Sequence, residues 1–203
     1  MKLQTLFSIL FCSGVIGGFI SCNHSSSLRT RKEALGKLIF QDTQLSEPAG
    51  QSCATCHTAD KGFADRDSRI VSEGAVRGLY SQRNSMTICY SMYVPSLYFD
   101  DEEETYVGGL FWDGRSPSLQ HQAGEPSLNP VEMGNPDRSS VVKKVRRASY
   151  YPELVRLYGE TANVDSLYAH ITDALSIYQQ SKEVNSFSSK YDAWERGEYV
   201  FTE

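Results

Sequence analysis

The pentapeptide Cys53-Ala54-Thr55-Cys56-His57 constrains this chain more than any other feature of its sequence. Two cysteines three positions apart, followed at once by a histidine, match the C-x-x-C-H pattern for covalent attachment of c-type haem. This spacing lets both thiols reach the vinyl groups on one edge of a porphyrin, while the histidine supplies an imidazole to the iron. The motif therefore predicts a chain folded around one covalently bound c-type haem.

Other chemistries remain open for these cysteines. A structural zinc site would need a second pair of cysteine or histidine ligands, and the rest of the body offers only Cys89, far from any suitably spaced histidine. A thioredoxin-like redox pair would follow a strand, whereas Cys53 follows a helical pattern and a Pro/Gly loop at 47–50. A plain disulfide between Cys53 and Cys56 also remains an alternative. We expect Cys89 to be a small buried hydrophobic residue.

The N-terminus resembles an export signal. Lys2 precedes an uncharged stretch from Leu6 to Ile20, which is too short and too rich in glycine for a membrane span. The following Phe19-Ile20-Ser21-Cys22 resembles the lipobox of bacterial lipoproteins, in which the cysteine is lipid-modified after cleavage. We therefore expect a signal peptide of the lipoprotein type at 1–21, lipidation at Cys22, a polar tether at 22–29, and a periplasmic protein anchored to the membrane only through lipid.

Composition supports a globular body and argues against nucleic-acid binding. The chain has 203 residues, of which 40% are hydrophobic, and its formal net charge of -5 provides no dominant basic patch. Apolar spacing predicts helices at 28–40, 152–158 and 165–182, and Asn135-Pro136 predicts the cap and first residue of another helix that ends near Ala148. No strand ladder is expected, and the Gly-, Pro- and Ser-rich stretch 58–134 is expected to form long ordered loops.

Further motifs in this stretch resemble the bacterial di-haem cytochrome c peroxidase family, which also includes enzymes that mature a tryptophan-derived quinone cofactor. The matching segments are Leu35-Gly36-Lys37-Leu38-Ile39-Phe40, Arg83-Asn84 with Thr87, Phe111-Trp112-Asp113-Gly114-Arg115, Gln122-Ala123-Gly124 and Asn129-Pro130-Val131-Glu132-Met133. The resemblance implies a mostly α, cytochrome c-like helical haem domain with long ordered loops at 30–190. It also implies that 191–203 is a truncated linker toward a second haem domain that the sequence does not contain.

The resemblance implies roles for seven residues of this sequence. Cys53 and Cys56 would hold the haem, and His57 would be the proximal ligand of the peroxide-reacting iron. Glu132 and Gln122 would line the distal side, where a carboxyl group with a raised pKa moves protons and an amide orients peroxide. Two residues would lie toward the second haem domain. Trp112 would be an electron conduit, although it could also simply be a core residue, and Asn84 would be part of a calcium site.

Two departures from the family pattern qualify these roles. Many members carry a distal histidine before the R-N segment, but 58–83 contain no histidine, so we expect an open iron and a high-spin resting haem. The sequence also contains no second C-x-x-C-H motif. Without the interface that would cover Trp112, an exposed apolar patch is expected there unless a partner, such as a second haem domain or a second copy, covers it.

The sequence thus favours a periplasmic haem peroxidase domain that reduces hydrogen peroxide with electrons from a small cytochrome or similar donor. A non-enzymatic electron-transfer cytochrome is the alternative, and it would need a sixth ligand from the set Met86, Met92, Met133 and His121. A third possibility is a fragment that needs its missing partner to fold. His121 is expected at the surface, and His170 in the core or at its boundary.

Overall fold

The computed structural model describes residues 19–67 and 69–202, with the side chains described from residue 28 onward. Most of the predicted signal peptide, and the side chain of Cys22, therefore lie outside the described part. The α-helices, in chain order, are α1 (Phe19–Gln41), α2 (Cys53–Cys56), α3 (Leu119–Leu128), α4 (Arg138–Val145), α5 (Tyr151–Tyr158), α6 (Val164–Gln179) and α7 (Lys190–Glu195). Three 3-10 turns (Thr43–Leu45, Ala59–Lys61 and Ser91–Tyr93) and the strands β1 (Tyr98–Asp100) and β2 (Thr105–Val107) complete the fold.

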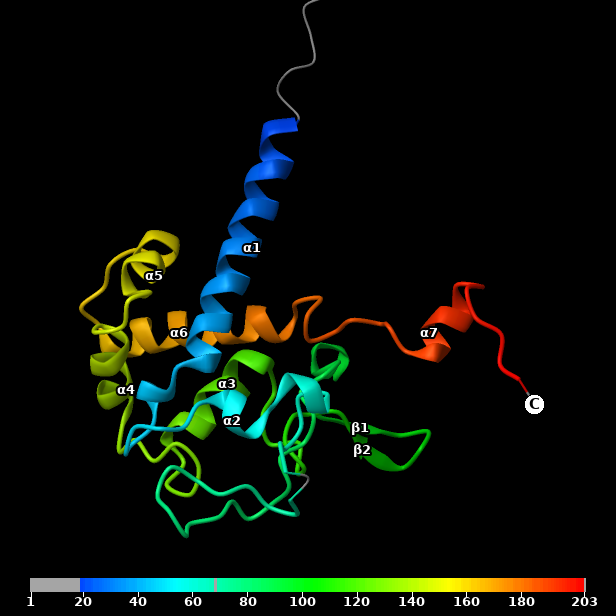
Figure 1. The fold of residues 1–203 in the computed structure, drawn as a ribbon, viewed down its shortest axis with the longest axis horizontal. Helices are drawn as coiled ribbons and strands as arrows, with labels where there is room; N and C mark the ends of the chain where they lie inside the picture. The colour runs from blue at the N-terminus through cyan, green and yellow to red at the C-terminus, as the bar shows by residue number, and fades with distance from the viewer. Residues whose placement is uncertain (1–18, 68, 203) are drawn as a thin grey trace, which may run out of the picture.

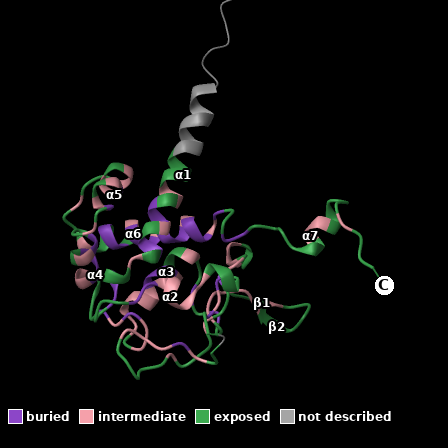
Figure 2. Ribbon diagram, viewed as in Figure 1, coloured by how far each residue is buried: buried purple, intermediate pink, exposed green. Residues whose placement is uncertain are grey.

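The crossing of α1 and α6 organises the core (Figure 1). Leu35 and Ile39 of α1 are buried, and α6 buries Leu167, Ile171 and Leu175. Gly36 lies at the contact, where a Cβ would come within 2.0 Å of the Ala174 carbonyl oxygen. Helices α3 and α4 also pack against α6, so buried residues concentrate along this helix (Figure 2).

Most predicted helices are present, with shifted ends. Helix α6 starts at Val164 because the Asn163 side chain accepts a 2.8 Å hydrogen bond from the Ser166 N–H. The prediction that Asn135 and Pro136 start α4 is wrong, because Asp137 caps that helix by accepting from the Ser140 N–H at 2.7 Å. Asn135 is instead buried, and its amide donates to the carbonyl oxygens of Leu45 and Ser127.

Helix α1 begins before the predicted helix at 28–40 and includes residues 22–29, which the sequence marked as a tether. Within the part of the chain that the structure describes, no helix combines the length and the apolar character needed to cross a membrane.

The expectation of loops throughout 58–134 is wrong in two places. Helix α3 forms although it contains Gly124 and Pro126, because Gly124 permits close packing: its Cβ would lie 3.2 Å from the Tyr168 ring. A short antiparallel hairpin also forms, with Tyr98 opposite Val107. Between residues 58 and 118, the described part of the chain buries only two large hydrophobic side chains, Phe63 and Ile88.

Candidate haem site

The C-x-x-C-H motif forms a single helical turn, α2, next to the core. The Ser52 N–H donates to the Thr55 hydroxyl at 3.0 Å, and the His57 N–H donates to the Cys53 carbonyl at 2.9 Å. These bonds close the turn from both ends. Cys53 packs against the hydrophobic core, so the motif is fixed to the α1/α6 body.

His57 is oriented as a metal ligand should be. Its Nδ1 lies 3.0 Å from the carbonyl oxygen of Phe63, and because a carbonyl can only accept, Nδ1 must carry the proton. The other ring nitrogen, Nε2, is then unprotonated and able to bind iron, the usual arrangement of histidine ligands. Burial lowers the pKa of His57, which further favours the neutral, ligating form.

The two cysteines of the motif are available for attachment. Cys53, Cys56 and Cys89 are all free thiols, so the part of the chain with described side chains contains no disulfide. Burial raises the pKa of Cys53 to about 12 and also raises the pKa of Cys56, so both are neutral at physiological pH. Cys89 is half-buried rather than buried, and it too lines the cavity described next.

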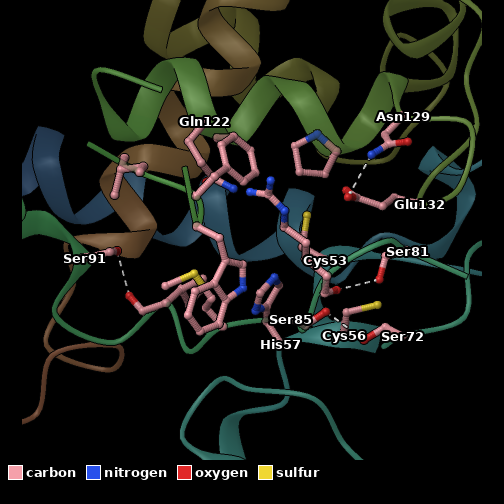
Figure 3. A pocket seen from close by; sticks show the side chains of 18 of the residues that line it. Cys53, Cys56, His57, Ser72, Ser81, Ser85, Ser91, Gln122, Asn129 and Glu132 are labelled. Carbon is pink, nitrogen blue, oxygen red and sulfur yellow. Dashed lines mark hydrogen bonds between the residues drawn. The ribbon is translucent and has the colours of Figure 1, made fainter. Parts of the chain in front are cut away.

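A cavity of about 890 Å³ opens beside the motif (Figure 3), at the upper end of the range for cofactor sites. Cys53, Cys56 and His57 form one wall, and Gln122 of α3 and Glu132 lie on the opposite wall. Two thiols, an imidazole whose Nε2 is left unprotonated by the bond from Nδ1 to Phe63, and a cavity of this size fit a covalently held porphyrin. They do not fit zinc, because the part of the chain that the structure describes contains no group of three or more His, Cys, Asp or Glu side chains that could hold a metal ion.

Glu132 is a half-buried carboxyl group on the wall opposite His57. Its Oε1 accepts a 2.9 Å hydrogen bond from the Asn129 amide, and its backbone carbonyl accepts from the Ala75 N–H at 2.7 Å. Burial raises the pKa of Glu132, against the lowering effects of the Asn129 hydrogen bond and the Arg115 charge. The side chain therefore keeps its proton to a higher pH than an exposed glutamate does, which suits a group that both takes and returns a proton.

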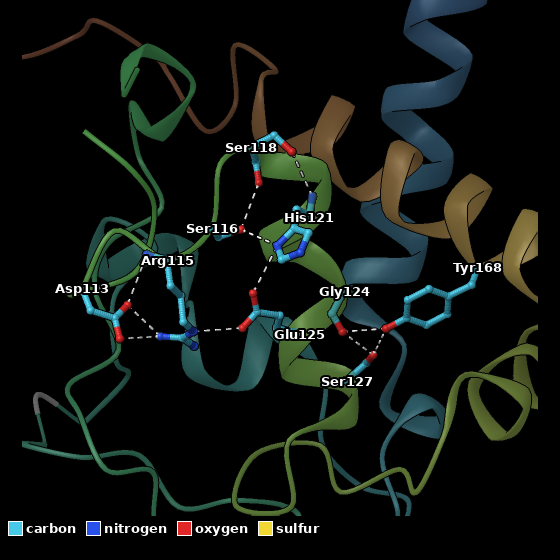
Figure 4. Close-up of polar contacts among 9 residues, drawn as sticks. All are labelled: Asp113, Arg115, Ser116, Ser118, His121, Gly124, Glu125, Ser127 and Tyr168. Atoms are coloured by element: carbon cyan, nitrogen blue, oxygen red, sulfur yellow. Dashed lines mark hydrogen bonds and ion pairs between the residues drawn. The ribbon is translucent and has the colours of Figure 1, made fainter. Parts of the chain in front are cut away.

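Arg115 lines the cavity and lies between two acidic side chains, Asp113 and Glu125 (Figure 4). Its guanidinium bonds Asp113 at 2.9 Å and Glu125 at 3.1 Å, and it stacks 3.7 Å from the Phe111 ring centroid. Glu125 in turn contacts His121 Nδ1 at 3.2 Å. His121 is exposed, as predicted, and it does not line the cavity.

Trp112 lines the cavity and is 59% exposed, so the alternative that it is a core residue is wrong, and its exposure agrees with the expected apolar patch. Its indole N–H donates to the Asn84 carbonyl at 3.0 Å. The Asn84 amide donates to the carbonyl oxygens of Arg69 and Ile70. Asn84 and Trp112 thus lie together at the rim of the cavity, and their conduit and calcium roles stay predictions.

Sequence reasoning assigned no role to three further residues of the cavity wall. Gln51 donates to the Glu73 carbonyl at 2.5 Å and lies 4.0 Å from the Cys56 sulfur, while Ser72 bonds Asp65 and, at 2.7 Å, Ser85. Asn129 orients Glu132. Only Asn129 carried a usable signal, its position three residues before the carboxyl group in the Asn129–Met133 segment.

The model of one protein family, described as di-haem cytochrome c peroxidase, matches residues 30–200. The chain belongs to this family. Methylamine utilization protein MauG of Paracoccus denitrificans is 40% identical over 176 residues, which cover 83% of this chain and 45% of that protein. Cytochrome c peroxidase Ccp of Escherichia coli is 32% identical over 169 residues, which cover 83% of this chain and 32% of that protein.

A solved member of the family has the same fold. The diheme peroxidase BthA from Burkholderia thailandensis superposes with a TM-score of 0.78 at 33% identity, over 84% of this chain and 43% of that one. Membership of the di-haem cytochrome c peroxidase family confirms the mostly helical fold and implies a covalently bound c-type haem. The chain spans less than half the length of each of these three proteins.

Proposed function

We propose that this chain is a c-type haem domain that reduces hydrogen peroxide to water. One observation carries the proposal: a single cavity has the attachment motif and His57 on one wall, and an orienting amide and a carboxyl group with a raised pKa on the other. Family membership supports haem binding and peroxidase-type chemistry at a coarser level. In the balanced reaction, one hydrogen peroxide, two electrons and two protons give two water molecules.

Different residues of this chain would bind haem, orient peroxide and transfer the proton. When bound, the haem would supply the iron that receives peroxide and passes it the electrons that break the O–O bond. Cys53 and Cys56 would tether it, and His57 would hold the iron through Nε2. Gln122 cannot titrate, so it orients peroxide by hydrogen bonds. Glu132 takes the proton from the oxygen that binds and returns it to the oxygen that leaves.

We further propose that the protein works in the periplasm, with electrons from a small cytochrome or a similar donor. Lipidation of Cys22 would anchor it to the membrane, and a second haem domain or a second copy would cover Trp112. Calcium at Asn84 belongs to the same proposal. These parts rest on the sequence motifs and on the family, whose curated members include cytochrome c peroxidases.

The test uses the chain matured with haem in a bacterial periplasm. Pigment should stay with the polypeptide after denaturation, and stopped-flow spectra should show a rapid reaction with peroxide. We expect Glu132→Gln to slow this reaction about 100-fold or more, the usual scale for a general acid/base group.

Glu160→Gln is the matched control, because Glu160 is exposed and outside the cavity. Equal rates in the wild type, Glu132→Gln and Glu160→Gln would remove Glu132 from the mechanism. Loss of the pigment on denaturation would show that haem is not covalently attached.

A further inference from the structure

The hairpin of β1 and β2 is a two-stranded sheet without a neighbour. Tyr98 pairs with Val107, Phe99 with Tyr106, and Asp100 with Thr105. In the described part of the chain no third strand joins either edge, and the hairpin projects from the loop side of the molecule, away from α4 and α5 (Figure 1). An isolated hairpin of this length is only marginally stable in water. Packing in the hydrophobic core does not explain its side chains, which therefore point to another role.

Aromatic side chains lie exposed on this hairpin. Phe99 is 49% exposed and Tyr106 is 70% exposed, and their ring centroids lie 5.2 Å apart in an edge-to-face pair. Tyr98 beside them is exposed as well. Aromatic residues of this kind are enriched at the centres of protein interfaces.

The last residue of β1 and the whole turn that follows it are acids, Asp100 to Glu104. None of these five carboxylates forms an ion pair with any described residue, although many other acidic residues of the chain do. Asp100 only accepts hydrogen bonds from the Glu102 and Glu103 N–H groups. Five unpaired negative charges beside exposed aromatic rings select a partner with a basic rim and an apolar centre.

The hairpin is rooted in the haem cavity wall. The Gly109 N–H donates to the Pro95 carbonyl at 2.8 Å, which closes the base of the hairpin, and the Leu110 N–H donates to the Ser116 carbonyl at 2.8 Å. Leu110 and Trp112, a few residues after β2, line the cavity. A protein docked on the hairpin would therefore lie beside the cavity rim, where Trp112 is exposed.

We propose that the 98–107 hairpin is a docking site for a basic electron-carrier protein. Lysines around the carrier's redox centre would face the carboxylates of 100–104, and its apolar centre would cover Phe99 and Tyr106. This inference rests on the proposed function, because two reduced carriers supply the two electrons that one peroxide consumes. The negative charge disfavours anionic lipid and nucleic acid, and the described residues contain no group of three or more His, Cys, Asp or Glu side chains that could hold a metal ion.

The test measures binding of the haem-loaded chain to a lysine-rich mitochondrial-type cytochrome c by calorimetry. Raising the salt from about 10 mM to about 150 mM shortens the screening length from about 30 Å to about 8 Å, and the affinity should fall with it. Glu102→Gln/Glu103→Gln should weaken binding about tenfold, and Phe99→Ser should weaken it at both salt concentrations. A redox protein with an acidic surface, or the same cytochrome with acetylated lysines, should not bind.

Asp60→Asn/Glu160→Gln removes the same charge from exposed residues outside the hairpin and should leave binding unchanged. Equal affinity of the two double variants, affinity that is insensitive to salt, or no binding by the wild type would each overturn the proposal. Peroxide turnover with guaiacol, a small neutral donor, tests the proposed function separately. Guaiacol turnover without cytochrome binding would contradict only the proposed docking site. Cytochrome binding without guaiacol turnover would contradict the proposed peroxidase activity and still support the docking site.

Discussion

Glu132 is the residue whose chemistry depends most directly on its surroundings. Burial raises its pKa above that of an exposed glutamate, so on acidification it gains its proton at a higher pH than an ordinary carboxyl would. A base must be unprotonated to act. We therefore expect the rate constant for the reaction with peroxide to fall as the pH drops through this raised pKa, and to level off above it.

Stopped-flow measurements from about pH 4 to pH 8, a range that brackets the reference glutamate pKa, would show this acid limb. Glu132→Gln should lose the limb as well as the rate, whereas Glu160→Gln should keep both. An acid limb that persists in Glu132→Gln would assign it to another group.

The resting state of the iron depends on which side chains reach it. Among the described residues that line the cavity, His57 is the only histidine. We expect the ferric protein to be high-spin by its absorption and electron paramagnetic resonance spectra, as an iron without a sixth protein ligand should be.

The alternative, an electron-transfer cytochrome, predicts a low-spin spectrum. Met86 and Met133 line the cavity, while Met92 and His121 do not. A low-spin spectrum that becomes high-spin in Met86→Leu or Met133→Leu would favour that alternative and count against the peroxidase.

At the residue scale, the structure brings the three residues of the motif to one wall of a single cavity, while their attachment to haem stays a prediction. The hydrogen bond from His57 to the Phe63 carbonyl could not be predicted, because every residue has a backbone carbonyl and residue type does not show which one accepts. The exposure of Trp112 was expected from the family resemblance, as part of an apolar patch that another domain or copy would cover. The residue type of Trp112 alone favours burial, and only the course of the surrounding loop places it at the rim.

At the scale of the elements, the crossing of α1 and α6 depends on Gly36. A methyl group there would meet the Ala174 carbonyl oxygen at 2.0 Å, so Gly36→Ala must push the two helices apart. Overpacking of this kind costs about 1–3 kcal/mol, more than the roughly 0.5–1 kcal/mol that alanine gains over glycine within a helix. We expect a net loss of about 1–2 kcal/mol in the free energy of unfolding, measured by urea titration.

Leu38→Ala in the same helix is the matched control, because Leu38 is 51% exposed and should change the free energy of unfolding by less than about 0.5 kcal/mol. A stabilised Gly36→Ala variant would show that the helices can separate without cost.

The helices that sequence predicted best are those with a clear apolar stripe. Helix α6 was expected at 165–182 and is found at Val164–Gln179. Helix α3 was missed because Gly124 and Pro126 favour a loop locally, and only the packing of Gly124 against Tyr168 explains why a helix forms. The hairpin was missed because its acidic turn and short strands lack the alternation of a buried sheet.

At the scale of the whole molecule, the two halves of the body are built differently. The α1/α6 half has a continuous hydrophobic core, whereas residues 58–118 bury only Phe63 and Ile88 among their large described hydrophobic side chains and surround the cavity instead. Loops with so few buried contacts open at low cost in free energy. A porphyrin in the cavity would supply the apolar surface that these loops otherwise lack.

We therefore expect Cys53→Ala/Cys56→Ala, which cannot attach haem, to be cut by thermolysin within 66–118 while α1 and α6 stay intact. The haem-loaded wild type should resist under the same conditions, because a group that binds the folded state shifts local opening toward the closed form. Fragments identified by mass spectrometry would locate the cuts. Cleavage spread equally over α6 and the loops would mean that the helical half depends on haem as well, and equal resistance of both proteins would mean that the loops are held by the chain alone.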